Sequence, residues 1–120
     1  MDRNQRAFLH STQFDDIWEK LGLKDEDLRS MQNFIITKPN VGQLFRNTGG
    51  FRTMRMGSEK EGKKGGYRVI YTDLSAYSFV YLLMLYPKSE KTTLTDAEKK
   101  VLRVISKTTI DAFRKREVQW

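Results

Sequence analysis

The chain has 120 residues, 38% of them hydrophobic and 12% aromatic, which suits one domain around one core and leaves little room for a second. Its net charge of +7 favours a polyanionic partner, although an acidic protein or an anionic membrane surface would also be attracted. The absence of cysteine excludes disulfides, thiolate metal sites and cysteine nucleophiles. We therefore expect a single domain over residues 1–120.

The first third of the sequence has the pattern of a strand and two helices. Residues 6–10 form a short candidate edge strand, and Ser11 or Thr12 can cap a helix. That helix carries an apolar face at helical spacing and ends at Gly22. A second helix is expected from Asp25 to the pre-proline residue Lys38. The expected apolar positions are Phe14, Ile17, Trp18 and Leu21 in the first helix, then Leu28, Met31, Gln32 and Ile35 in the second.

The rest of the sequence predicts three strands and a final helix. Residues 51–56 and 67–72 alternate like strands around a polar, glycine-rich loop, and the apolar residues 78–86 suit a central strand that Pro87 ends. Thr95 and Glu98 have the spacing of a capping box. The helix that follows is expected to bury the side chains of Val101, Leu102, Ile105, Thr109 and Ala112.

No segment has the features of a membrane or export signal. The longest apolar run, residues 79–86, is far shorter than the ~20 residues that span a bilayer. The polar N-terminus lacks the apolar stretch of a signal peptide. The expectation is a soluble cytoplasmic protein without membrane contact.

Several common enzyme signatures are absent or incomplete. Residues 57–64 nearly match a phosphate-binding P-loop, but Lys64 replaces the hydroxyl that binds Mg²⁺ and the loop joins two strands. The single histidine, His10, rules out a paired-histidine ribonuclease. No acidic cluster follows a strand end and no nucleophile elbow is present. No metal or cofactor is therefore expected.

A set of cations on the central strands is the strongest functional signal. The middle of the chain, residues 43–88, carries eight basic and three acidic residues. Arg55 and Arg68 lie within apolar strand patterns, where an unpaired guanidinium is costly unless it faces a groove. Aromatic residues alternate with the cations, which suits base stacking beside phosphate binding, although they are equally compatible with a core. Nucleic-acid binding is favoured over a plain solvated surface. The cations are Arg46, Arg52, Arg55, Lys60, Lys63, Lys64, Arg68 and Lys88, and the aromatics are Phe51, Tyr67, Tyr71 and Tyr86.

Three segments in order resemble the RelE/ParE toxin superfamily, and most closely its HigB-like branch. They are TGGFRTMR (residues 48–55), GKKGGYRVIY (62–71) and YPKSEK (86–91). The resemblance extends over roughly residues 6–112. It implies an α+β fold of the RelE type, in which an N-terminal helix hairpin and a C-terminal helix pack on a small antiparallel sheet.

The resemblance also implies a function. It is that of a type II toxin that cleaves mRNA in the ribosomal A site, without a metal, through attack of a ribose 2′-hydroxyl on the adjacent phosphate. The implied partners are a cognate antitoxin of the helix-turn-helix type, the 70S ribosome and mRNA, with operator DNA reached only through the antitoxin complex. Alternatives are a ParE-like gyrase inhibitor, a lapsed toxin that acts as a partner or corepressor, and an RNA-binding module without turnover.

Matching positions give the implied site. Arg55 contacts the scissile phosphate, Arg68 stabilises the phosphorane, and both are expected to face inward. Lys64 and Lys88 complete the catalytic set. Thr53 stands where the family usually has lysine, which leaves the general base open between those two lysines. RNA or ribosome contacts are expected from Arg46, Arg52, Lys60, Lys63, Tyr86 and Lys91.

Overall fold

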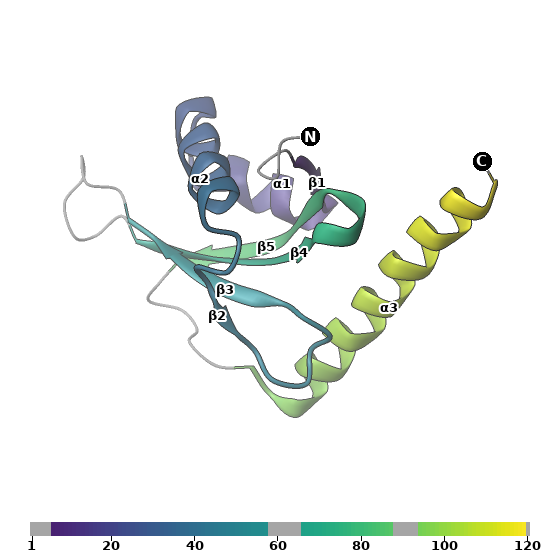
Figure 1. Ribbon diagram of the computed structural model, residues 1–120. Helices are drawn as coiled ribbons and strands as arrows, with labels where there is room; N and C mark the ends of the chain where they lie inside the picture. The colour runs from purple at the N-terminus through teal and green to yellow at the C-terminus, as the bar shows by residue number, and fades with distance from the viewer. Residues whose placement is uncertain (1–5, 58–65, 88–93, 120) are drawn as a thin grey trace.

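A computed structural model describes residues 6–57, 66–87 and 94–119, with side chains as far as Lys115. Within these ranges three helices pack on the two faces of a five-stranded sheet (Figure 1). In chain order the elements are β1 (Ala7–His10), α1 (Thr12–Lys20), α2 (Asp25–Thr37), β2 (Gln43–Leu44), β3 (Arg52–Met56), β4 (Tyr67–Leu74), the 3₁₀ turn η2 (Ser75–Tyr77), β5 (Phe79–Pro87) and α3 (Asp96–Gln119).

The sheet has the strand order β1-β5-β4-β3-β2 and is mixed. Strands β2 to β5 pair antiparallel, whereas β1 pairs parallel with β5. The expected α+β fold with helices packed on a small sheet is confirmed, and the one departure from the expected antiparallel pairing is the parallel contact of β1 with β5. Each strand from β2 to β5 runs opposite to its neighbour, and β5 runs in the same direction as β1. The two-residue edge strand β2 was also not expected from the sequence.

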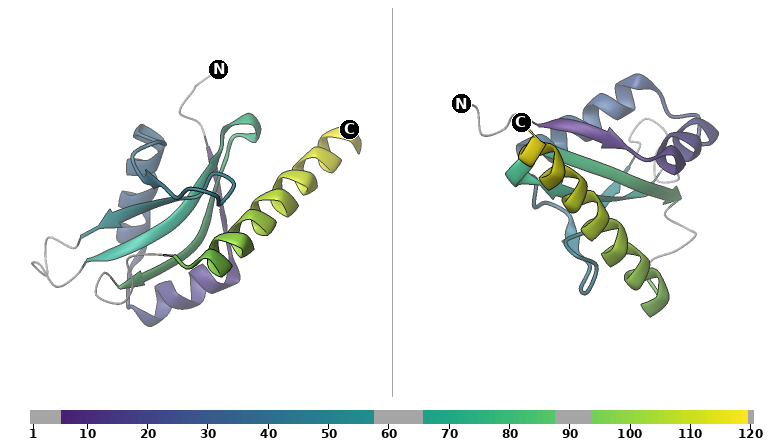
Figure 2. Two further views of the ribbon diagram at one scale, coloured as in Figure 1. Left: turned by 90° about the horizontal axis from the view of Figure 1, so that it is seen from below. Right: turned by 90° about the vertical axis from the view of Figure 1, so that its right-hand side faces the viewer.

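Helices α1 and α2 cover one face of the sheet (Figures 1 and 2). Ser11 starts α1 as its cap, since its side chain accepts a hydrogen bond from the Phe14 amide. The same hydroxyl donates to the carbonyl of Leu83, the extra residue of a β-bulge in β5. Phe14, Met31 and Ile35 are fully buried against this face, as the helical spacing predicted.

Helix α3 lies on the opposite face (Figure 2). The predicted capping box is present, with hydrogen bonds of 2.9 and 3.1 Å between Thr95 and Glu98. Leu102 packs with Phe51, Ile70 and Leu83 in a second core cluster. Val101 and Ala112, expected to be buried, are exposed, because at about 100° per residue they lie beside the face formed by Leu102, Ile105, Ser106 and Thr109.

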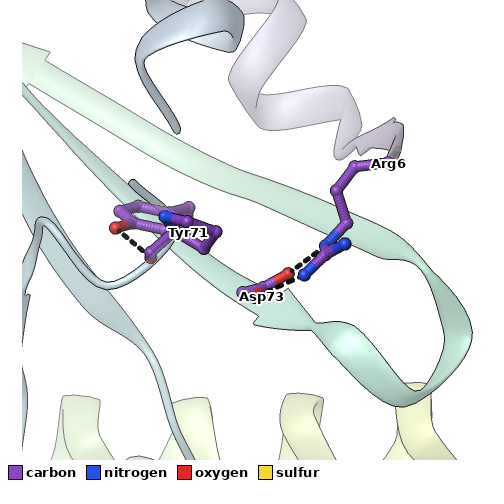
Figure 3. Close-up of polar contacts among 4 residues, drawn as sticks. Arg6, Tyr71 and Asp73 are labelled. Carbon is purple, nitrogen blue, oxygen red and sulfur yellow. Dashed lines mark hydrogen bonds and ion pairs between the residues drawn. The ribbon is translucent and has the colours of Figure 1, made fainter. Parts of the chain in front are cut away.

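Polar contacts of Tyr71 and Asp73 lie beside the core cluster packed beneath α1 and α2 (Figure 3). The Tyr71 hydroxyl donates to the Pro39 carbonyl at 2.9 Å and accepts from the Gly42 amide at 3.0 Å. A Cβ at Gly42 would lie 2.9 Å from this ring, so only glycine allows the approach. Arg6 and Asp73 form an ion pair with contacts of 2.8 and 3.4 Å across β5.

Candidate functional site

Three of the predicted site residues lie in one row across the sheet. In the strand register Arg55 of β3 stands opposite Arg68 of β4, and Arg68 stands opposite Tyr86 of β5. Residues paired in register project to the same face of a sheet. Because Tyr86 belongs to the cluster beneath α3, this cationic row lies on the α3 face.

The two arginines differ in their surroundings. Arg55 is exposed and Arg68 is half-buried, so the expectation that both face inward is wrong. A buried, unpaired guanidinium would cost far more than one at the rim of a sheet, where its charge stays hydrated. Arg68 nevertheless has its Nε atom buried without a hydrogen-bond partner. That N–H can only donate, so Arg68 offers a free donor at the centre of the row.

The next row towards α3 is formed by Thr53, Ile70 and Met84. Thr53 is only 8% exposed, and its Oγ1 atom also has no partner. Ile70 and Met84 line an apolar cavity of about 240 Å³ between the sheet and α3. Leu94 and Leu102 form part of its other wall. The cationic row thus lies beside an apolar cavity. This arrangement suits a ligand that has an anionic and an apolar part.

Arg52 lies apart from this row. It alternates with Thr53 along β3 and so projects to the other face of the sheet, where its Nη1 atom donates to the Gly42 carbonyl at 2.8 Å. Arg46 is exposed beyond β2. The other cations predicted for the site are outside the described residues: Lys60, Lys63, Lys64, Lys88 and Lys91.

The aromatic residues that alternate with the cations are core residues. Phe51 and Tyr71 are fully buried, and Tyr67 is 5% and Tyr86 9% exposed. Burial raises the pKa of Tyr67 to about 12, with a smaller contribution from the charge of Asp27. Burial likewise raises the pKa of Tyr71. Tyr67 and Tyr71 therefore keep their protons at neutral pH, and both belong to the core cluster beneath α1 and α2.

His10 takes no part in this surface. It lies on the edge strand β1, as expected, and its Nδ1 atom is 2.9 Å from a carboxylate oxygen of Asp15. Across the described ranges no three histidine, aspartate or glutamate side chains gather as a metal site would require. No helix in those ranges is long and apolar enough to cross a membrane.

The apolar cavity is the part of the site that sequence reasoning missed. Its walls combine residues from β4, β5 and α3, and their convergence depends on how α3 docks. No local pattern in the sequence carries that information. Thr53, in contrast, could be singled out from the sequence, because the RelE/ParE pattern usually has lysine at this position.

Comparison with known proteins agrees with this architecture. The fold is similar to that of a double-alanine variant of the E. coli toxin RelE in the free state, with a TM-score of 0.55 and 15% identity over 84% of this chain and 96% of the other. A second structure, the isolated E. coli RelE toxin, matches at a TM-score of 0.46 and 12% identity over 83% and 98%.

The fold is thus that of an α+β protein with a cationic surface on one face of its sheet. A family model described as the RelE toxin of the RelE/RelB toxin–antitoxin system matches residues 6–119. The chain belongs to the RelE toxin family, whose members are paired with an antitoxin.

Proposed function

We propose that this toxin is a metal-independent endoribonuclease that cleaves mRNA on the ribosome. The observation that carries the proposal is the row of Arg55, Arg68 and Tyr86, with a free donor on Arg68 at its centre. Guanidinium groups match the geometry of phosphate oxygens and stay charged at all physiological pH values. Such a row can hold a phosphate of an RNA strand.

The nucleophile of the proposed reaction comes from the RNA strand itself. The 2′-oxygen of a ribose attacks the adjacent phosphorus and forms the P–O2′ bond, and the P–O5′ bond then breaks. A base removes the 2′-proton and an acid supplies a proton to the leaving 5′-oxygen. The products are a 2′,3′-cyclic phosphate and a 5′-hydroxyl. Arg68 and Arg55 stabilise the negative charge that builds up on the phosphorane.

The proton-transfer groups come from outside this row. Arginine remains protonated and cannot serve as a base. Tyr67, whose pKa is raised to about 12, also keeps its proton at neutral pH. We assign the general base and acid to Lys64 and Lys88. An amine near the phosphate can exchange a proton when neighbouring cations lower its pKa.

We further propose the partners that this reaction requires. The ribosome presents the mRNA in the A site, and Arg46 and the lysines of the hairpin loop add contacts to RNA phosphates. A cognate antitoxin with a helix-turn-helix domain silences the toxin, and operator DNA is bound through that antitoxin.

The proposal is tested by translation in a purified system. The wild-type toxin is expected to arrest translation of an mRNA template, and Arg68→Ala to reduce the rate of arrest by about 100-fold, as loss of a transition-state donor does. Arg29→Ala, a charge-matched change of an exposed residue on α2, is the control. Unchanged arrest by both Arg68→Ala and Arg55→Ala would refute the assigned site.

A further inference from the structure

Thr53 and Arg68 carry the buried side-chain polar atoms that lack a hydrogen-bond partner in the described part of the chain. We propose that the Thr53 hydroxyl and the Arg68 Nε–H together bind one phosphate group of the RNA substrate. Thr53 is then a substrate-contacting residue in its own right. This inference rests on the proposed function and specifies how its site holds the anion.

The strand register brings the two groups together. Thr53 stands opposite Ile70 and Arg68 opposite Arg55, so Thr53 and Arg68 are diagonal neighbours on adjacent strands. Such neighbours have their backbones about 7–8 Å apart and lie on the same face. Both groups can donate a hydrogen bond. Two oxygens of one phosphate can therefore accept from the hydroxyl and from the guanidinium at once.

The other buried threonine and serine side chains of the described chain all have hydrogen-bond partners. Thr48 donates to the Phe45 carbonyl at 2.8 Å, and Thr72 donates to the Gly50 carbonyl at 3.0 Å. Ser106 donates to the Gly49 carbonyl at 2.9 Å. These are the buried polar side chains apart from Thr53. A buried hydroxyl without a partner is less favourable than a methyl group of the same size, so valine at position 53 would suit the free fold better. A bound ligand gives this hydroxyl a partner.

The burial of Thr53 also explains why a hydroxyl can bind the phosphate where the family usually has lysine. The Thr53 side chain is only 8% exposed. A lysine ammonium at this place would add a second cation beside the Arg68 guanidinium, and its desolvation would cost free energy. The hydroxyl supplies a hydrogen bond without added charge. The charge needed to hold the phosphate comes from Arg68 and Arg55.

The test combines affinity and stability of the full-length protein. The probe is a short 2′-O-methyl RNA, which cannot be cleaved because its 2′-oxygen is blocked. Thr53→Val is expected to weaken its binding roughly ten- to hundredfold, as loss of a hydrogen bond to a charged group does, while the melting temperature stays equal or rises. Thr53→Ser, which keeps the hydroxyl, is expected to retain most of the affinity.

Thr72→Val is the matched control, because it removes a bonded hydroxyl from the same face of the sheet. It is expected to lower the melting temperature without changing affinity. Inorganic phosphate, followed by the NMR signal of the Arg68 Nε–H, should shift that signal in the wild type and less in Thr53→Val.

Wild-type affinity in Thr53→Val, or no shift of the Arg68 signal with phosphate, would overturn the inference even if translation arrest is observed. Phosphate binding that depends on Thr53 in a protein that leaves translation running would support the phosphate site and refute the proposed function.

Discussion

At the scale of single residues, the ion pair between Arg6 and Asp73 ties the edge strand β1 to β4. Each side chain is only 12% exposed, and the hydrogen bond that Arg6 donates to the Asp73 carboxylate raises the pKa of Arg6. Asp73→Ala leaves the guanidinium without this acceptor in a poorly hydrated place. We expect a loss of about 2–4 kcal/mol in the free energy of unfolding, measured by urea denaturation.

A matched control is the exposed pair of Lys107 and Asp111, whose atoms are 4.0 Å apart. Asp111→Ala is expected to cost less than about 0.5 kcal/mol, because water screens both charges. Equal losses in Asp73→Ala and Asp111→Ala would contradict the structural role given to the Arg6–Asp73 pair.

Tyr67 makes stability depend on pH in the alkaline range. The unfolded chain ionises this residue near a pKa of about 10, whereas burial holds the folded value at about 12. Above pH 10 the unfolded state therefore loses the proton first, and the free energy of unfolding falls as pH rises to 12. The slope from this group is at most about 1.4 kcal/mol per pH unit.

Tyr67→Phe removes the ionisable group and is expected to flatten this decline. The measurement is urea unfolding of the wild type and of Tyr67→Phe between pH 9 and 12. The lysines and the other tyrosines titrate alike in the two proteins, so the difference between the curves reports on Tyr67. If the two curves run parallel through this range, the raised pKa of Tyr67 is not a factor in folding.

At the scale of elements, α3 is held against the sheet by the loop between β2 and β3. Arg103 donates to the Asn47 carbonyl at 2.6 Å, and Ser106 donates to the Gly49 carbonyl at 2.9 Å. Gly49 has a φ of +79°, and a Cβ there would lie 2.8 Å from the Ser106 side chain. Glycine is thus needed both for the backbone conformation and for the close approach.

Gly49→Ala is expected to destabilise the protein by about 1–3 kcal/mol and to loosen α3. Amide hydrogen exchange should become faster in α3 than in β4 and β5. Gly57→Ala is the control, since a Cβ at that glycine meets no atom within 4 Å. Uniform protection in Gly49→Ala would show that the loop does not hold the helix.

Strand β3 carries one arginine with a structural contact and one with a proposed functional role, on opposite faces of the sheet. Arg52 donates to the Gly42 carbonyl on one face, and Arg55 is exposed in the cationic row on the other. We expect Arg52→Ala to cost about 1 kcal/mol of stability and to leave translation arrest per folded molecule unchanged. Arg55→Ala should reduce arrest and keep the stability. The reverse pattern, measured by denaturation and arrest assays, would exchange their roles.

At the scale of the whole molecule, local patterns predicted the helices and every strand except β2, but not the long-range pairing of the strands. Ser11, the Thr95 capping box and the spacing of Phe14, Met31 and Ile35 act within a few residues, so the sequence alone located the helices. The parallel contact of β1 with β5 joins Ala7 to Phe79, and no local signal encodes such a pair.

For the candidate site as well, local features could be predicted from the sequence, whereas long-range ones could not. The opposition of Arg55 and Arg68 follows from one hairpin and was within reach of sequence reasoning. The exposure of Arg55, the partial burial of Arg68 and the cavity beneath α3 depend on which face each helix covers. The separation of Arg52 from these residues depends on it as well. Alternation along a strand shows that two faces exist, but it does not say which of them a distant helix will occupy.

The most direct test of the proposed RNA cleavage is mapping of mRNA ends after the toxin acts on translating ribosomes. We predict new 5′ ends that carry a hydroxyl, lie at a fixed position within codons, require ribosomes and disappear in Arg68→Ala. Intact transcripts in the presence of active, folded toxin would contradict the account, and DNA breaks under the same conditions would point to gyrase as the target instead.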